Sequence, residues 1–287
     1  MKVPDPPPIR SYLYVPGDDP RKMEKALASE ADAVVFDLED AVALERKEDA
    51  RDAVAKIVIS APPKPCFVRL NKPGSAFIED DIHAVAGPHL TGLRLPKVES
   101  TQDVLRVAER LQSYGCEAVV WCLIESALGL EQAFEIARSH ERVAGLGLGE
   151  ADLSADLGVL SDEGLLYARS RIVAASRAAG LPNPVQSVYT NVKDAEGLRR
   201  STKSGKALGF MGRSAIHPAQ VPIINEVFTP TEEEVSGARE LLDALEAATG
   251  NGSGAFALPD GRFVDEAVVR SARAKLALAR RSEGGKP

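Results

Sequence analysis

Short apolar runs rich in β-branched residues alternate with amphipathic stretches along most of the 287-residue chain. Apolar runs of about four to eight residues are typical of buried strands, whereas apolar positions three and four residues apart predict helices. Each apolar run is followed by a helical stretch. The predicted strands cover residues 11–16, 33–40, 66–71, 92–97, 118–125, 143–149, 184–189 and 209–215.

This alternation predicts a parallel sheet joined by right-handed crossovers. Eight strand–helix units in a little over 200 residues match an α/β fold of the (β/α)8 TIM-barrel type. An open, doubly wound sheet is the alternative, although it usually needs fewer strands. One helix is expected to begin after a cap at Ser100 or Thr101 and to end at Gly115.

The pattern changes after residue 229. Residues 230–287 predict a helix with an acidic first turn, a Gly-rich loop and a final helix. We therefore expect a TIM barrel over residues 1–229, with a loose, Pro-rich tail at 1–9. The C-terminal helix-loop-helix extension over 230–287 is expected to cap the barrel or to pack on a neighbouring subunit.

Composition narrows the possible partners. The net charge of −7 and the pI near 5.3 argue against a nucleic-acid partner, which requires a basic face. No apolar run reaches the roughly 18 residues of a membrane span, and the N-terminus lacks the apolar core of a signal peptide. The three cysteines form no CxxC pair. Buried free thiols and a cytoplasmic location are the expected consequences.

Two acids interrupt apolar runs one unit apart. Glu125 follows one predicted strand and Asp152 follows the next, and 152 − 125 = 27 residues separate them. Because the carboxyl ends of neighbouring barrel strands meet at one rim, both side chains are expected near the usual position of a barrel active site. Two carboxylates in a dry cleft repel unless a proton or a cation lies between them. Oxygen ligands without a His or Cys cluster favour Mg²⁺.

Each acid also has a structural interpretation. Glu125 could be an acid at a helix N-terminus, and Asp152 could cap the turn that follows it. The shared spacing favours metal binding for the pair.

Other charged residues are expected at the same rim. Asp37, Glu39 and Asp40 cluster at the end of the second strand, where some could accept hydrogen bonds from metal-bound water. Arg69 ends the third strand and predicts an anionic partner, either a carboxylate substrate or a structural ion pair with Glu39 or Asp40. Lys97 ends the fourth strand at the same rim, but its sequence context is weaker evidence for a role in the site than that of Arg69.

A set of motifs resembles the citrate lyase β-subunit-like (CitE-like) branch of the HpcH/HpaI aldolase family over roughly residues 10–280. The motifs are "YLYVPGDDPRKMEKAL", "AVVFDLEDAV", "FVRLN", "LRLPKVES", "CLIESALGLEQAFEIA", "GLGEADLSADLG", "YARSRIVAASRAAGL", "SVYTNVKDAEGL", "GFMGRSAIHPAQVPIINEVFTP" and "DGRFVDEAVVRSA". The resemblance implies a TIM barrel that assembles as a homotrimer or hexamer. It also implies Mg²⁺ dependence and substrates that are CoA thioesters of small hydroxy acids.

The resemblance also implies roles for individual residues. Glu125 and Asp152 correspond to the metal ligands, and Arg69 to the arginine beside the reacting carbonyl. Asp265 corresponds to an acid/base that a C-terminal segment delivers to a neighbour's active site. Arg21 and Lys25 fall where the family contacts CoA phosphates; from the residues alone they form only a weak anion site at a helix N-terminus.

The implied activity is Mg²⁺-dependent carbon–carbon cleavage, or the reverse Claisen-type synthesis, of malyl-CoA, citramalyl-CoA or citryl-CoA. Gln186 and Ser187 stand where many relatives have Asp-Gly, so substrate choice could differ. The alternatives are a malyl-CoA thioesterase, a CoA-independent hydroxy-keto-acid aldolase and a citrate lyase β subunit that needs partner subunits.

Overall fold

The computed structural model describes residues 9–249 and short stretches of the C-terminal segment at 256–257, 263–264, 268–269, 272–273, 275–276 and 278–279. Within it the chain divides into two compact units, with the division between Asn225 and Glu226. The first unit covers Ile9–Asn225 and contains the candidate site. The second contains the described residues from Glu226 onward.

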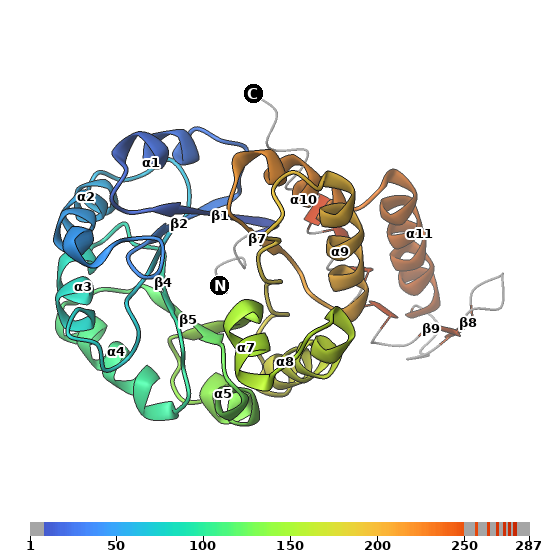
Figure 1. The fold of residues 1–287 in the computed structure, drawn as a ribbon. Coiled ribbons are helices and arrows are strands. Elements are labelled where there is room, and N and C mark those ends of the chain that lie inside the picture. Colours follow the sequence, from blue (N-terminus) through green and yellow to red (C-terminus); the bar gives the residue numbers. More distant parts are fainter. Residues whose placement is uncertain are drawn as a thin grey trace. The chain divides into compact units, whose positions relative to one another are not determined.

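A parallel seven-stranded sheet forms the centre of the first unit (Figure 1). Its spatial order is β6-β5-β4-β3-β2-β1-β7, so neighbours in sequence are neighbours in the sheet from β1 to β6, as consecutive strand–helix units require. The strands are β1 (Ser11–Pro16), β2 (Ala33–Asp37), β3 (Cys66–Arg69), β4 (Gly92–Leu95), β5 (Val119–Ile124), β6 (Val143–Leu148) and β7 (Arg213–Ala215).

The sheet is curled around an apolar cluster. Side chains from β1, β2, β3 and β5 meet Val185 in one buried group, although those strands are spread across the sheet. Tyr12 and Trp121 lie at its centre, with ring centroids 6.0 Å apart. Gly145 on β6 makes room for Trp121, because a Cβ there would lie 2.4 Å from the indole ring.

The strand expected over residues 184–189 is not present as a strand. Its residues form two single bridges, Val185 with Gly147 on β6 and Gln186 with Arg213 on β7. Pro184 has no N–H to donate, which limits the ladder at this point. The segment nevertheless pairs with both end strands of the sheet, since it bridges β6 on one side and β7 on the other.

Helices surround the sheet in the first unit (Figure 1). The expected helix after β4 is confirmed: Ser100 caps it in a capping box with Asp103, and Gly115 follows its end with a φ of +63°. The helices are α1 (Pro20–Leu27), α2 (Lys47–Ile59), α3 (Ile78–Val85), α4 (Thr101–Ser113), α5 (Ala127–Glu131), α6 (Ala133–Ala137), α7 (Glu150–Leu157), α8 (Leu166–Ala178) and α9 (Ala195–Leu208). None of the helices in the described part of the chain has the length and apolar character to cross a membrane.

The unit boundary falls within α10 (Val221–Phe228), and the second unit continues with α11 (Glu232–Thr249), the expected helix with an acidic first turn. The stretch expected as a Gly-rich loop contains two short antiparallel strands, β8 (Phe256–Ala257) and β9 (Phe263–Val264). The described residues at 268–269, 272–273, 275–276 and 278–279 are helical, which agrees with the expected final helix. Val269 and Ala272 pack with Ala238 and Leu241 of α11.

The three cysteines are buried and free, as expected. Burial raises the pKa of the Cys66 and Cys122 thiols to about 12. Since the thiolate is the reactive form, both groups are inert packing residues at neutral pH.

Candidate metal and substrate site

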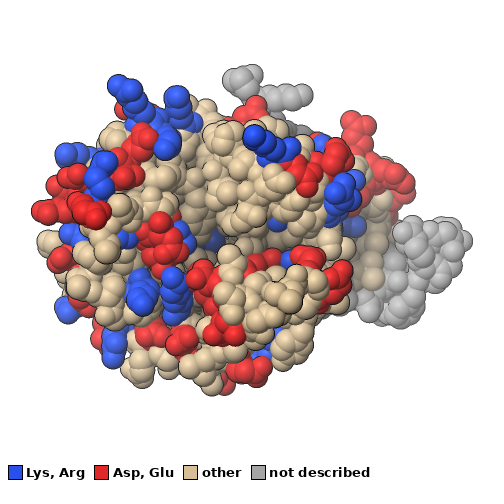
Figure 2. Space-filling view, viewed as in Figure 1, with Lys and Arg blue, Asp and Glu red and all other residues tan. Residues whose placement is uncertain are grey.

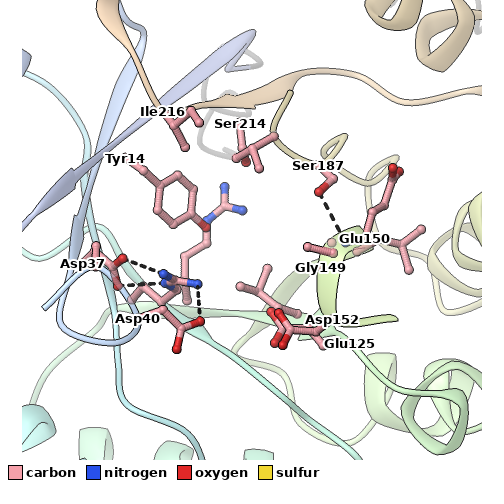
Figure 3. A pocket seen from close by; sticks show the side chains of 18 of the residues that line it. Tyr14, Asp37, Asp40, Glu125, Gly149, Glu150, Asp152, Ser187, Ser214 and Ile216 are labelled. Carbon is pink, nitrogen blue, oxygen red and sulfur yellow. Dashed lines mark hydrogen bonds and ion pairs between the residues drawn. The ribbon is translucent and has the colours of Figure 1, made fainter. Parts of the chain in front are cut away.

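A cavity of about 480 Å³ lies at the carboxyl ends of the strands in the first unit. Residues from all seven strands of the sheet, from the bridge segment and from the start of α7 line it. Figure 2 shows charged side chains of both signs around the hollow at the middle of this unit. Figure 3 shows the acids, the serines and Tyr14 that border the cavity. This is the edge of a parallel α/β sheet at which active sites are built.

Glu125 directly follows β5 and is only 5% exposed. Its Oε2 atom has no hydrogen-bond partner among the described residues. Burial raises the pKa of Glu125 to about 8, with the charges of Glu39 and Asp152 adding to the shift and Arg69 opposing it. The side chain lies across the backbone of residue 149, where a Cβ would come within 2.5 Å of it, so Gly149 is required. Glu125 is therefore a buried carboxyl whose charge lacks a dedicated protein partner.

Asp152 lies in the first turn of α7, three residues after the N-cap Gly149. The structural interpretation of Asp152 as a cap is wrong, since Gly149 has that position. Its side chain is 50% exposed, and its Oδ1 lies 3.9 Å from the Nζ of Lys97. Glu125 and Asp152 both line the cavity and lie close together in Figure 3. Carboxylates at the end of one strand and at the start of the next helix thus reach the same space.

These two residues fit a divalent cation. A buried carboxyl with an unpaired oxygen and a raised pKa, beside a second carboxylate, is the arrangement that a cation between them would stabilise. Within the described part of the chain, no three or more His, Cys, Asp and Glu side chains form a potential metal cluster. Two carboxylates with water completing the shell suit Mg²⁺, whereas structural zinc uses a closed set of four ligands.

Arg69 at the end of β3 forms ion pairs with acidic residues at and just after the end of β2. Its Nε and Nη2 donate to the two oxygens of Asp37 at 2.8 and 2.5 Å. Its Nη1 lies 3.1 Å from Glu39 and 3.8 Å from Asp40. The structural ion-pair alternative for Arg69 is therefore present, and Asp37 is its main partner. Arg69 also lines the cavity, so the same contacts orient a cation toward any bound ligand.

Two lysines support this region. Lys47 on α2 donates to the carbonyl oxygens of Leu38 and Glu39, both at 2.6 Å, which fixes the loop after β2. Lys97 adopts a φ of +52° just after β4, and its Nζ lies 3.4 Å from Glu39. Lys97 therefore lies between the β2 acids and Asp152, a more central position than its sequence context indicated.

Two of the remaining predicted residues lie outside the cavity. Arg21 and Lys25 are exposed on α1 and are not part of the cavity lining. Asp265 lies outside the described residues.

The sequence interpretation missed several cavity residues. Arg94 on β4 was a charged residue inside an otherwise apolar strand, a signal that could have been used. The sequence around Tyr14 and Ser214 did not indicate that either residue would line a site. Glu150, at the start of α7, is held by a two-point contact with Arg169 at 2.9 and 2.7 Å. Ser187, which the sequence had marked as unusual, accepts a hydrogen bond from the backbone N–H of Glu150 at 3.4 Å.

Comparison with known proteins places this architecture in a family. Residues 10–218 match the HpcH/HpaI aldolase/citrate lyase family. A (3S)-malyl-CoA thioesterase from Cereibacter sphaeroides is 38% identical over 277 residues, covering 95% of each chain. A citrate lyase subunit beta from Leuconostoc mesenteroides subsp. cremoris is 35% identical over 283 residues, covering 94% of this chain and 93% of its own.

Solved structures agree with this placement. CitE from Mycobacterium tuberculosis, in complex with magnesium, acetoacetate and coenzyme A, has a TM-score of 0.77 and 32% identity, covering 95% of this chain and 98% of its own. The citrate lyase beta subunit from the same organism, complexed with oxaloacetate and magnesium, has a TM-score of 0.69 and 32% identity, covering 78% of this chain and 98% of its own. The protein belongs to the HpcH/HpaI aldolase/citrate lyase family.

Proposed function

We propose that the protein is a Mg²⁺-dependent carbon–carbon lyase, or the corresponding Claisen-type synthase, acting on a small hydroxyacyl-CoA such as malyl-CoA, citramalyl-CoA or citryl-CoA. The observation that carries the proposal is the pair Glu125 and Asp152, two acids that have no short ion pair with any described residue and that line a cavity also lined by Arg69. A relative whose structure contains both magnesium and coenzyme A supports it.

The chemistry follows from these side chains. Held by Glu125 and Asp152, Mg²⁺ would supply a Lewis acid and a template for the substrate's oxygens. Arg69, kept in place by Asp37, provides a fixed cation for the negative oxygen of the thioester enolate. A preorganised donor of this kind typically contributes about 3 kcal/mol to transition-state stabilisation. Asp265 is proposed to exchange a proton with the enolate carbon, arriving from a neighbouring subunit of a trimer or hexamer.

Coenzyme A recognition is proposed for the exposed face of α1. Arg21 and Lys25 lie there, one helical turn apart, where both can reach solvent-exposed phosphates. The bridges of Val185 and Gln186 to both end strands also support an eight-stranded closure of the sheet, with the segment at 184–187 in the place of one strand.

A thioesterase is the second candidate. It is favoured by the 38% identity to a (3S)-malyl-CoA thioesterase over 95% of both chains. The same metal and Arg69 could then bind the hydroxyacyl group while water attacks the thioester carbonyl.

A product assay distinguishes these activities. Purified protein is incubated with malyl-CoA, citramalyl-CoA and citryl-CoA, with Mg²⁺ or with EDTA, and the products are identified by mass spectrometry. Mg²⁺-dependent formation of acetyl-CoA and a 2-oxo acid is the expected result. Free CoA with an intact hydroxy acid would favour the thioesterase. Unchanged substrates under both conditions would contradict the proposal and favour a CoA-independent aldolase or a subunit that needs partners.

A further inference from the structure

Asp156 is a carboxylate outside the cavity that joins the two segments on which the candidate metal ligands lie. Glu125 comes just before the short helix α5, and Asp152 lies in the first turn of α7. Asp156, one helical turn after Asp152, accepts a hydrogen bond at 2.7 Å from the backbone N–H of Ala127. Ala127 is the first residue of α5 and lies two residues after Glu125. The contact therefore connects the chain just after one ligand to the chain just after the other.

This hydrogen bond satisfies a group that α5 itself leaves without a partner. The first N–H groups of a helix have no acceptor within the helix. At α5 the hydroxyl of Ser126 accepts from the N–H of Gly129 at 3.1 Å, and Asp156 accepts from Ala127. The donor is fixed by the backbone and the acceptor is charged, which makes the hydrogen bond stronger than one between neutral groups. The helices α5 and α7 contact each other and lie side by side in Figure 1.

Other contacts join the same two segments just before α7. The N–H of Gly149 donates to the carbonyl oxygen of Ile124 at 3.0 Å. Residue 149 also lies so near Glu125 that a Cβ there would come within 2.5 Å of its side chain. These contacts precede Asp152 in the chain, and the Asp156 contact follows it. Contacts on both sides of the ligands restrict the separation of Glu125 and Asp152 more than contacts on one side alone.

We propose that Asp156 is a positioning residue for the cation, because its hydrogen bond to α5 holds Glu125 and Asp152 at the separation that one Mg²⁺ ion requires. This inference rests on the metal site of the proposed function and goes beyond it, since Asp156 neither lines the cavity nor belongs to the proposed ligands.

The chemistry of the cation makes the inference specific. Mg²⁺ requires near-ideal octahedral geometry with oxygen ligands at about 2.0–2.1 Å, whereas Ca²⁺ accepts flexible geometry at about 2.3–2.6 Å. A small change in the separation of two carboxylates therefore weakens the binding of Mg²⁺ more than the binding of Ca²⁺. Asp156 thus contributes to the preference of the site for the smaller ion.

Two other roles for Asp156 make different predictions. Asp156 is exposed, so its hydrogen bond can stabilise α5 as a cap without affecting the site. Removal of a simple cap lowers the free energy of unfolding and leaves the affinity for both cations unchanged. Alternatively, the negative charge of Asp156 attracts the cation from a distance. Removal of the charge then weakens the binding of both cations, whether or not the hydrogen bond is kept.

Calorimetric titrations of Mg²⁺ and of Ca²⁺ into metal-free protein at the same pH distinguish these roles. Wild type is compared with Asp156→Ala and Asp156→Asn. We expect Asp156→Ala to weaken Mg²⁺ binding about fivefold or more and Ca²⁺ binding by less than about twofold. Asp156→Asn keeps an oxygen that accepts from the same N–H, so its Mg²⁺ affinity should stay within about twofold of the wild type.

Asp19→Ala is the matched control. Asp19 caps α1 by accepting a hydrogen bond from the N–H of Lys22 at 3.1 Å, so the variant removes the same kind of contact from another helix. Its affinities for Mg²⁺ and Ca²⁺ should equal those of the wild type. Urea denaturation of the metal-free proteins checks that each variant is folded.

Three results would overturn the inference. Wild-type Mg²⁺ affinity in Asp156→Ala would leave Asp156 as a cap only. Equal weakening in Asp156→Ala and Asp156→Asn would assign the effect to charge, and equal weakening of Mg²⁺ and Ca²⁺ binding in Asp156→Ala would contradict a role in geometry. The titrations contain no substrate, so a protein that binds Mg²⁺ but cleaves no thioester would contradict the lyase proposal while these results still decide the role of Asp156.

Discussion

The two sides of the cavity differ in the cations that lie near their acids. On the β2–β3 side, Asp37 receives two hydrogen bonds from Arg69, and Glu39 lies within 3.1 Å of Arg69 and 3.4 Å of Lys97. On the β5–β6 side, Glu125 is buried with an unpaired oxygen, and Asp152 has only a 3.9 Å contact with Lys97. On the first side Arg69 and Lys97 face the acids, although neither carboxylate oxygen of Glu39 has a hydrogen bond among the described residues and burial raises the pKa of Glu39. The second is left for a ligand to neutralise.

This difference shows that an acid's partners are a better guide to its role than its position at a strand end. All of these acids follow parallel strands, and burial alone does not separate them, because Asp37 and Glu39 are as buried as Glu125. The free energy needed to bury a charge is balanced by Arg69 on one side. On the other side a cation must enter the cavity, or the carboxyl must keep its proton.

Removal of Arg69 is expected to have the largest effect. Arg69→Met leaves Asp37 and Glu39 buried without their main cation, which should lower the free energy of unfolding by about 3–5 kcal/mol. Urea denaturation measures this loss. Arg110→Met is the matched control, since Arg110 forms an exposed 2.7 Å pair with Glu79 and should cost no more than about 1 kcal/mol. Similar losses in the two variants would show that the β2–β3 acids do not depend on Arg69.

The pH dependence of stability tests the other side. Burial raises the pKa of Glu125 to about 8 in the folded protein from its ordinary value of 4.5, so the folded state holds a proton that the unfolded state releases. Its contribution to stability is complete below pH 4.5 and is lost as the pH rises through 8. In EDTA, Glu125→Gln should lack this loss, and its free energy of unfolding should exceed that of the wild type by roughly 1–3 kcal/mol at pH 8. Parallel stability curves for the two proteins from pH 5 to 9 would contradict the raised pKa.

Asp152 should have the smallest effect on folding. Its side chain is 50% exposed and has no short ion pair, so Asp152→Asn should change the free energy of unfolding by less than about 0.5 kcal/mol. Mg²⁺ affinity should nevertheless fall about tenfold or more, because a ligand is lost. Asp80→Asn, an exposed acid on α3, is the control for both measurements. Unchanged Mg²⁺ affinity in Asp152→Asn would remove Asp152 from the site.

The sequence predicted the sheet well where local signals were strong. The strands β1 to β6 lie within the predicted ranges, since each is a short, mainly apolar run between helical stretches. The seventh predicted strand failed because Pro184 limits pairing, which leaves only the bridges at Val185 and Gln186. Spacing alone predicted that Glu125 and Asp152 border one cavity.

The electrostatic details could not be predicted in the same way. Arg69 has Asp37 as its main partner, a contact between two strands that the sequence does not specify. The positive φ that brings Lys97 toward Glu39 and Asp152 depends on the packing of the loop. Arg94 was overlooked because its isolation is a property of its surroundings: only the folded cavity shows that its Nε and Nη2 have no hydrogen-bond partner among the described residues.

The central claim, that the β5–β6 acids bind the cation, is tested most directly by calorimetric titration of Mg²⁺ into metal-free protein at pH 8.5. Wild type, Glu125→Gln and Glu39→Gln are compared, since Glu39 is an equally buried acid on the opposite side. We predict one Mg²⁺ per chain for the wild type and for Glu39→Gln, and an affinity about 100-fold or more weaker for Glu125→Gln. Wild-type affinity in Glu125→Gln, with binding lost in Glu39→Gln, would contradict the account and move the metal to the β2–β3 side.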